Sequence, residues 1–373
     1  MKKLMLALAA AAAISSGWSA DFGRLSDGRE THLFRLTGSG GLIIDVSDYG
    51  GRVVRVYAPD RFGNLADVTL GWNTAAEYEK YGICMGTLIG RYGNRIAHGR
   101  FELDGKTVQL PLNEVSATRH CNLHSGPLGW DTKVWAARLF RDGDVPGIEL
   151  SYTSADGEMG FPGTVKCKVT YRVLPSNIWT VDYEATTDKP TVINLTHHAY
   201  WNMAGEASGN VLAQKLQIFA DEYSQTDAGL IPTSNAPVKG TGFDFTSPRA
   251  IGHHATWMAA QPELSATRNW YDHNFVLRGK IGELHPAATL KDPVSGRRLD
   301  IWTTEPCLQV YGSQSMHGTL PSKTAGHRYP QFAGIVLETQ HYPDSPNRPD
   351  FPSTVLRPGE TFRSHSEYRF SAE

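Results

Sequence analysis

An all-β sandwich of antiparallel strands is the fold class that this sequence predicts. Short segments rich in β-branched and aromatic residues recur along the chain, bounded by Gly, Pro, Asn and Asp. Helical periodicity is scarce, and 37 glycines interrupt the pattern. Many short strands with few helices are typical of a sandwich and argue against a fold that alternates strands with helices.

Each strand is predicted from its own segment. The pattern is carried by residues 52–57, 147–153, 164–173, 178–186, 191–194, 215–220, 298–303, 308–312, 334–339 and 364–370. Within 166–173, Lys, Thr and Arg alternate with Cys, Val and Tyr, which predicts an antiparallel sheet with one solvent-exposed face and one buried face. Residues 74–80 are the one short helix that we expect, with Thr74 as its N-cap.

The first twenty residues have the pattern of a secretory signal peptide. Lys2 and Lys3 precede an apolar, alanine-rich stretch at 4–14, and small residues follow at 15–20. Cleavage between Gly17 and Ala20 would leave a mature chain of roughly 355 residues. We expect 1–20 to be the signal peptide, 21–373 to be a single domain, and the product to be periplasmic or secreted. An uncleaved N-terminal anchor is the alternative.

Composition limits the classes of partner. Loss of the signal would remove two lysines and change the formal net charge from −2 to −4, and no basic stripe remains. Nucleic acid is therefore not expected as a partner, nor is a membrane once the signal is cleaved. A slightly acidic chain rich in Trp and Tyr suits a small, neutral, polar ligand such as a monosaccharide. The chain is expected to be a monomer or a dimer.

Four cysteines stand at positions that form no CxxC pair: Cys84, Cys121, Cys167 and Cys307. Their spacing identifies neither a metal site nor a particular disulfide. An oxidising compartment would permit disulfides. Burial of most of them as small apolar side chains is the interpretation that we favour.

Two histidines lie in the densest polar and aromatic cluster, residues 194–202, which follows a predicted strand. Neighbours on a strand point to opposite faces, so His197 and His198 should not line the same pocket. For the same reason the two rings are not expected to converge on a metal ion. A histidine can act as a general acid or base near neutral pH, although a hydrogen-bonded structural role is the simpler reading of either ring alone.

Glu338 ends an apolar strand and is followed by polar and aromatic residues, Thr339 to Asp344. A carboxylate after four apolar or glycine positions is predicted to be partly buried, which raises its pKa unless donors compensate. Such groups are frequent functional candidates. A charge paired with Lys or Arg at the strand end is the alternative.

Three further segments add polar groups, each of which is a weak signal alone. Asn94 and Arg95 lie beside glycines that permit close approach of backbone to a ligand, but no Walker-type phosphate loop is present. His124 lies in a turn-like segment, and Asp244 stands between two phenylalanines, a setting that suits recognition of sugar hydroxyls. Residues of these types in loops are usually plain turn formers.

Together these segments resemble the aldose 1-epimerases, also called galactose mutarotases, over nearly the whole mature length. The resemblance is carried, in order and spacing, by GRYGNRIAHGRF (90–101), NLHSGPLGWDTKVW (122–135), NLTHHAYWN (194–202), GTGFDF (240–245), YDHNF (271–275), GIVLETQHYPDSPN (334–347) and FPSTVLRPGE (351–360). It implies a large β-sandwich with the sugar in an open cleft, and interconversion of the α and β anomers of free hexoses without a cofactor or metal.

The resemblance also implies roles for individual residues. Glu338 matches the catalytic base and His198 the acid, and His124 could share the acid role. The positions that resemble sugar contacts are Asn94, Arg95, His124, Tyr200, Asp244 and Gln309. His197 replaces an asparagine and Glu305 a glutamine of some relatives. Glu305 would alter sugar preference if it faced the cleft.

Three other functions compete with this prediction. A hexose-6-phosphate mutarotase would need a basic phosphate subsite, and the export signal argues against it. A non-catalytic carbohydrate-binding sandwich would leave Glu338 and His198 without a purpose. A glycoside hydrolase or lyase would use two carboxylates, for which Glu338 and Asp244 are the candidates.

Overall fold

The computed structural model describes residues 18–373. Most of the expected signal peptide therefore lies outside the described residues, while Trp18–Ala20 belong to strand β1 (Trp18–Arg24). The described helices are short: α2 (Ala75–Tyr81), α3 (Ala255–Ala259), and the 3-10 turns η1 (Trp130–Thr132), η2 (Glu158–Gly160), η3 (Ile251–His254), η4 (Pro262–Thr267) and η5 (Ser345–Asn347). None of these helices is long and apolar enough to cross a bilayer.

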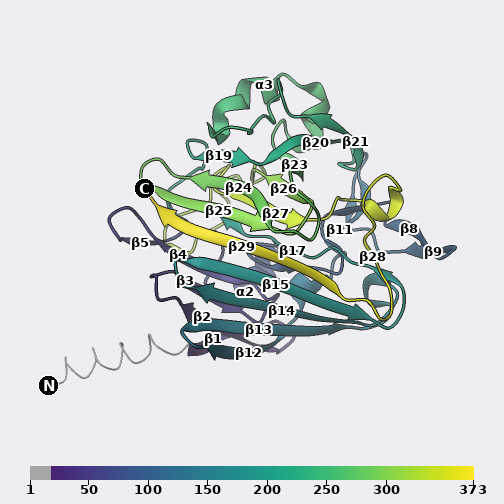
Figure 1. Ribbon diagram of the computed structural model, residues 1–373, viewed down its shortest axis with the longest axis horizontal. Coiled ribbons are helices and arrows are strands. Elements are labelled where there is room, and N and C mark those ends of the chain that lie inside the picture. Colours follow the sequence, from purple (N-terminus) through teal and green to yellow (C-terminus); the bar gives the residue numbers. More distant parts are fainter. Residues whose placement is uncertain (1–17) are drawn as a thin grey trace.

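A nine-stranded antiparallel sheet forms one face of the molecule (Figure 1). Its strands, in spatial order, are β12 (Ala136–Asp142), β13 (Val145–Ser154), β14 (Val165–Leu174), β15 (Ile178–Thr187), β29 (Phe362–Ala372), β25 (Arg297–Thr303), β24 (His285–Lys291), β19 (Lys215–Ile218) and β22 (Arg249–Ala250). The C-terminal strand β29 pairs with both β15 and β25, so the end of the chain forms a central strand of this sheet.

A six-stranded sheet carries most of the residues that matter below. Its order is β18 (Tyr200–Trp201), β27 (Ile335–Gln340), β26 (Cys307–Tyr311), β23 (Asp272–Leu277), β20 (Ala220–Thr226) and β21 (Pro232–Pro237). A five-stranded sheet joins β1 to β2 (Glu30–Thr37), β3 (Ile43–Ser47), β4 (Val53–Pro59) and β5 (Leu65–Asp67).

Four small sheets complete the described fold. They are β10 (Glu114–Val115) with β11 (His120–Leu123) and β7 (Arg95–Ala97), β16 (Thr191–Val192) with β28 (Val355–Leu356), β17 (Thr196–His197) with β6 (Leu88–Ile89), and β8 (Arg100–Leu103) with β9 (Lys106–Gln109). The short pairs tie loops to the large sheets and so fix the segments that surround the site.

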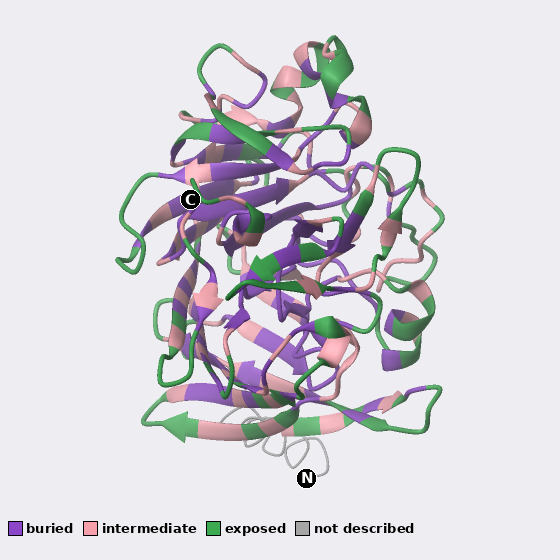
Figure 2. Cartoon of the chain, turned by 90° about the vertical axis from the view of Figure 1, so that its right-hand side faces the viewer, coloured by how far each residue is buried: buried purple, intermediate pink, exposed green. Residues whose placement is uncertain are grey.

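The main core lies between the nine-stranded sheet and the two other large sheets. Alternate residues of β14 are buried, as their sequence pattern predicts, while Lys166 and Lys168 point outward. Trp179 of the nine-stranded sheet stacks on Tyr368 with ring centroids 4.5 Å apart. Each fully buried large apolar side chain contributes about 1.5–3 kcal/mol. Figure 2 shows buried residues concentrated along the inner strands and exposed ones in the loops.

The alternation in the six-stranded sheet explains why polar groups gather on one of its faces. Leu308, Val310 and Leu337 belong to the main core. Gln309 lies between Leu308 and Val310 in sequence, and Glu338 follows Leu337. Gln309 and Glu338 are directly paired across β26 and β27, and they therefore share the opposite face. The strands that build the core thus also present carboxylate and amide groups away from it.

The predicted helix forms as α2. Thr74 accepts a hydrogen bond from the backbone N–H of Glu77, and the Glu77 carboxylate accepts one from the backbone N–H of Thr74. This reciprocal capping box fixes the helix start, and Gly82 ends the helix in a left-handed conformation. The all-β sandwich with few short helices is confirmed. All four cysteines are free thiols, and three of them are buried.

Candidate active site

A cleft of about 740 Å³ opens over the polar face of β23, β26 and β27. Asp272, Gln309 and Glu338 come from these three strands and line it. The rest of the lining comes from loops and short strands in distant parts of the sequence, among them residues 82–84, 113–116, 266–268 and 314–315. Its volume lies in the range of small-molecule sites.

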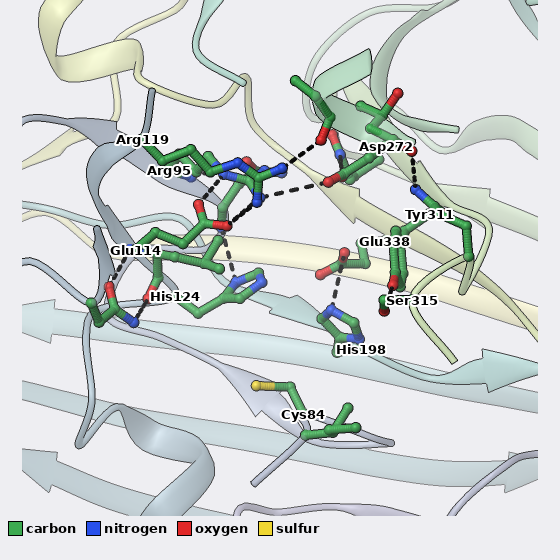
Figure 3. A pocket seen from close by; sticks show the side chains of 18 of the residues that line it. Cys84, Arg95, Glu114, Arg119, His124, His198, Asp272, Tyr311, Ser315 and Glu338 are labelled. Carbon is green, nitrogen blue, oxygen red and sulfur yellow. Dashed lines mark hydrogen bonds and ion pairs between the residues drawn. The ribbon is translucent and has the colours of Figure 1, made fainter. Parts of the chain in front are cut away.

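Glu338 and His198 meet in this cleft (Figure 3). His198 follows β17, and its Nε2 lies 3.6 Å from Oε1 of Glu338. Both residues are buried, with 7 % and 2 % of their surface exposed. The Nε2–Oε1 separation is longer than a hydrogen bond, so the two groups are neighbours that do not neutralise each other by direct contact. Atoms of a ligand can therefore engage both groups at once.

Burial drives both members of this pair toward their neutral forms. It raises the pKa of Glu338 well above its ordinary value; Asp272 acts in the same direction, and Arg95 opposes it. Burial also lowers the pKa of His198 to about 4. Removal of a charged group from water disfavours its charged form, which accounts for the opposite directions. A strand-end carboxylate with a raised pKa is what the sequence predicted for Glu338.

His197 faces away from the cleft, as strand alternation predicted. Its ring packs edge-on against Trp179 at 5.1 Å and against Tyr171 at 6.1 Å between centroids. Burial lowers the pKa of His197 to about 3, so the ring is neutral at physiological pH. His197 is thus a core residue, while its neighbour His198 lines the cleft.

His124 is held in one tautomer by the backbone beside it. Its Nδ1 accepts a hydrogen bond from the N–H of Asn94 at 3.1 Å, so the neutral ring carries its proton on Nε2. Burial, together with the charges of His198 and Arg95, lowers the pKa of His124 well below its ordinary value. The neutral ring therefore offers a hydrogen-bond donor at Nε2, and its share in the acid role stays a prediction.

Potential ligand atoms of His124, His198 and Glu338 lie within 4.8 Å of one another, a spacing that would suit a metal ion. The sequence did not indicate this grouping. The hydrogen bond at His124 Nδ1 nevertheless leaves that ring with an N–H at its other nitrogen. A metal ligand of this type normally donates from one ring nitrogen and coordinates with the other. The arrangement suits a sugar oxygen better than a cation.

Arg95, Asp272 and Gln309 form a connected polar wall. Gln309 Nε2 donates to Asp272 Oδ1 at 2.7 Å, and Arg95 Nη2 lies 3.6 Å from Asp272 Oδ2. Asn94 lines the cleft beside them with φ of 63°, and its side-chain oxygen accepts from the N–H of Arg95. The Tyr200 ring lies 5.2 Å from that of His198, which limits the rotation of the imidazole.

Seven of the eight residues predicted for the site line the cleft, and Asp244 does not. The Asp244 carboxylate accepts hydrogen bonds from the backbone N–H and the hydroxyl of Thr246, within its own turn. Asp272, from the YDHNF segment, provides the carboxylate on the cleft wall instead. The expectation for Asp244 is therefore corrected to Asp272, which the sequence analysis included only as part of the YDHNF segment.

Glu305 does not face the cleft either. Its buried carboxylate contacts His341 Nδ1 at 2.5 Å, outside the residues that line the cavity. Glu305 was expected to alter sugar preference only if it faced the cleft, so no such effect is expected. Glu114 and Arg119 line the cleft and were missed, because charged residues in a loop resemble ordinary solvated positions.

A β-sandwich with a buried carboxylate–imidazole pair in an open cleft defines a protein that can move protons on a small polar ligand. The model of the aldose 1-epimerase family matches residues 32–369. The chain is 38 % identical to human galactose mutarotase over 352 residues, covering 94 % of this chain and 97 % of that protein. It is 36 % identical to the aldose 1-epimerase of Escherichia coli K12 over 351 residues, 93 % and 97 % of the two chains. The chain belongs to the aldose 1-epimerase family.

Solved structures agree with this assignment. An aldose epimerase homologue from C. elegans superposes with a TM-score of 0.80 at 28 % identity, covering 92 % of this chain and 99 % of that one. The galactose 1-epimerase of Lactobacillus acidophilus gives a TM-score of 0.80 at 26 % identity, covering 95 % and 98 %. The protein is an isomerase of the mutarotase type.

Proposed function

We propose that this enzyme interconverts the α and β anomers of free hexoses such as glucose and galactose, with Glu338 as the base and His198 as the acid. The observation that carries the proposal is the 3.6 Å approach of Glu338 Oε1 and His198 Nε2 in the cleft. The names of the relatives, galactose mutarotase and aldose 1-epimerase, support the substrate class.

The reaction requires two proton movements at neighbouring oxygens. Glu338 takes the proton of the anomeric hydroxyl O1 while His198 gives one to the ring oxygen O5, and the C1–O5 bond opens. Rotation about C1–C2 presents the other face of the aldehyde, and the reverse transfers close the ring. Each positioned proton transfer contributes about 10²–10⁴-fold. The bonds and charges balance without a redox step, so the chemistry requires no cofactor.

A single proton shared by the pair is enough for this cycle. Base and acid are ready when Glu338 is a carboxylate and His198 an imidazolium, and ring opening converts them to the neutral acid and neutral imidazole. Burial favours that neutral form in the free protein. A sugar whose O1 donates to Glu338 and whose O5 accepts from His198 stabilises the charged form. The pair therefore titrates as one unit.

The surrounding groups hold the sugar while its ring is open. Arg95, with Asp272 and Gln309, offers both donors and acceptors to hydroxyls on one wall. His124 donates from Nε2 beside His198, with ring centroids 5.3 Å apart. Fixed partners keep the open-chain aldehyde in place for closure, and such orientation is a large part of catalysis within a cleft.

The rival functions find less support. A hydrolase that uses Glu338 and Asp244 lacks its second carboxylate, because Asp244 lies outside the cleft. A phosphate subsite for hexose 6-phosphates would need cations in the cleft that are free to bind it, whereas Arg95 and Arg119 are both paired with Glu114 and Arg268 contacts the ring of His317. A binding protein without catalysis would not need a carboxylate buried beside an imidazole.

We also propose that the protein is exported. The support is the pattern of residues 1–20, with its lysines, apolar stretch and small residues. Cleavage before Trp18 would keep the whole of β1, which pairs with β2 from Trp18 onward. N-terminal sequencing of protein from the periplasm or medium tests this, and an uncleaved cytoplasmic product would refute it.

Polarimetry on freshly dissolved α-glucose and α-galactose tests the catalytic proposal. Wild-type protein should accelerate the approach to equilibrium, and Glu338→Gln should lower the rate by about 10²–10⁴-fold while sugar binding largely survives. Asp244→Asn is the matched control, because it removes a carboxylate that the cleft does not contain, and it should keep the wild-type rate. A near-normal rate for Glu338→Gln would refute the assignment.

A further inference from the structure

Glu114, on the short strand β10, lies behind Arg95 and binds it from one edge. Its Oε2 accepts from Arg95 Nε at 2.6 Å, and its Oε1 accepts from Arg95 Nη2 at 3.1 Å. Two parallel hydrogen bonds of this kind fix the plane of a guanidinium as well as its position. Cys121 Sγ donates to the same carboxylate at 3.2 Å. Figure 3 shows Glu114 beside Arg95, with Asp272 beyond it.

This contact determines which part of Arg95 is left for a ligand. Nε and Nη2 are engaged by Glu114, and Nη2 also approaches Asp272. Nη1 is the remaining guanidinium nitrogen, and within residues 18–373 it has no hydrogen-bond partner. The Arg95 side chain is 7 % exposed, and the residue lines the cleft. Glu114 thus leaves one nitrogen of this buried, cleft-lining cation available to a ligand.

Arg119 extends the arrangement across the mouth of the cleft. Its Nη1 donates to Glu114 Oε1 at 2.7 Å, and its Nη2 donates to the carbonyl of Ala266 at 2.6 Å. The hairpin of β10 and β11 is thereby tied to the end of η4, and both segments line the cleft. Glu114 is the carboxylate on which the two arginines converge.

Charge explains why this carboxylate cannot be replaced by a neutral group of the same shape. Burial would raise the pKa of Glu114, but hydrogen bonds from Arg95 and its charge lower it to about 2. The group is therefore ionised throughout the physiological range. Without the charge of Glu114, Asp272, which already lies within ion-pair distance at 3.6 Å, would be the main partner of Arg95, and we expect the two to move closer together. The contact between Asp272 and Arg95 would then compete with the hydrogen bonds that each of them could make to the sugar.

We propose that Glu114 is a positioning residue that sets sugar affinity by holding Arg95 away from Asp272, with Arg119 as its outer support. The inference rests on the proposed mutarotase function. It assigns Glu114 no part in proton transfer, because the pair that moves protons is Glu338 and His198. The effect of its loss should therefore appear in KM and leave kcat near the wild-type value.

The test compares Glu114→Gln with the wild type by polarimetry on galactose and by calorimetric binding of anhydrogalactitol, which lacks the anomeric hydroxyl and cannot react. KM and Kd should both rise roughly 10- to 100-fold, the range that corresponds to one charged hydrogen bond, with kcat changed little. Glu102→Gln is the matched control, since Glu102 is an exposed carboxylate on a separate hairpin that contacts Arg100 and Thr107. It should leave both constants unchanged.

An unchanged KM and Kd in Glu114→Gln, or a fall in kcat at constant KM, would overturn the inference. Should that variant fail to fold, Arg119→Gln tests the outer support, because it leaves the two bonds between Glu114 and Arg95 in place. It should raise KM by less than Glu114→Gln, by about 3-fold, and no change would count against the proposal. Failure of wild-type protein to accelerate mutarotation would instead refute the proposed function itself.

Discussion

Two pairs of a carboxylate with an imidazole, each with a buried carboxylate, lie near the same strand, and they differ in how closely their atoms approach. In the cleft, Glu338 Oε1 and His198 Nε2 are 3.6 Å apart. Beyond the end of β27 and outside the cleft, Glu305 Oε2 and His341 Nδ1 are 2.5 Å apart. Glu305 and Glu338 are each 2 % exposed, so burial of the carboxylate does not distinguish the pairs.

The two imidazoles also differ in the direction of their pKa shifts. Burial would lower the pKa of His341, but the adjacent charge and hydrogen bond of Glu305 raise it above its ordinary value. His341 and Glu305 therefore form a fixed ion pair. At 3.6 Å the attraction is weaker, and burial instead lowers the pKa of His198 to about 4. The direct contact between Glu305 and His341 stabilises their charged forms. Glu338 and His198 are not in direct contact, so a bound ligand can change which of them carries the proton.

The largest expected difference between the pairs is in catalysis. His198→Asn should lower the mutarotation rate by about 10²–10⁴-fold, because it removes the proton donor to the ring oxygen. His341→Asn is the matched control and should keep the rate close to that of the wild type, since His341 does not line the cleft. Initial rates by polarimetry at saturating sugar measure both. Equal losses in the two variants would show that the pairs do not have separate roles.

Stability should respond in the opposite way. Glu305→Gln removes the charge that holds His341 and should lower the free energy of unfolding by about 1–3 kcal/mol, with little change in kcat. Glu149→Gln, which breaks the surface pair with Arg138, is the control and should cost about 0–1 kcal/mol. Urea unfolding at neutral pH gives both values. A stable Glu305→Gln variant with reduced activity would reverse the roles inferred for the two sites.

The smallest effect is a pH dependence of stability at Glu338. A carboxyl whose pKa is raised above 4.5 on folding binds more protons in the folded state, so the free energy of unfolding falls as pH rises toward the folded pKa. Glu338→Gln does not titrate and should become more stable relative to wild type between pH 5 and pH 9, a range that begins just above the ordinary pKa of a glutamate. His198, with its pKa lowered to about 4, stays neutral over this window.

Thermal or urea unfolding of the two proteins at both pH values measures this trend. A relative stability of Glu338→Gln that stays constant over this pH range would mean that Glu338 is already a carboxylate in the free protein. The contrast with the Glu305–His341 pair would then disappear.

Sequence patterns identified the elements well where the physical cause was local. Alternation of polar and apolar residues predicted β14, and the capping pattern predicted α2 with its N-cap Thr74. Alternation also separated His197 from His198, because a strand sends neighbours to opposite faces. The apolar run before Glu338 predicted a buried carboxylate for a similar reason.

Asp244 and Asp272 show the limit of this approach. Both lie between aromatic residues, in GTGFDF and YDHNF, and nothing in these short segments distinguishes them. Asp244 binds Thr246 within its own turn, whereas Asp272 begins a strand whose neighbour carries Gln309. The partner of a carboxylate across a sheet depends on strand order and register, which involve residues far away in the chain.

The sequence by itself determined the all-β class and the family, and it pointed to the two groups that we propose for proton transfer, because strand alternation and motif order are written along the chain. Only the tertiary structure decided which acids reach the cleft, how far Glu338 stands from His198, and that Glu114 lies behind Arg95. The physical reason is that distances between side chains from separate strands, and the burial that sets their pKa values, arise only when the sheets pack.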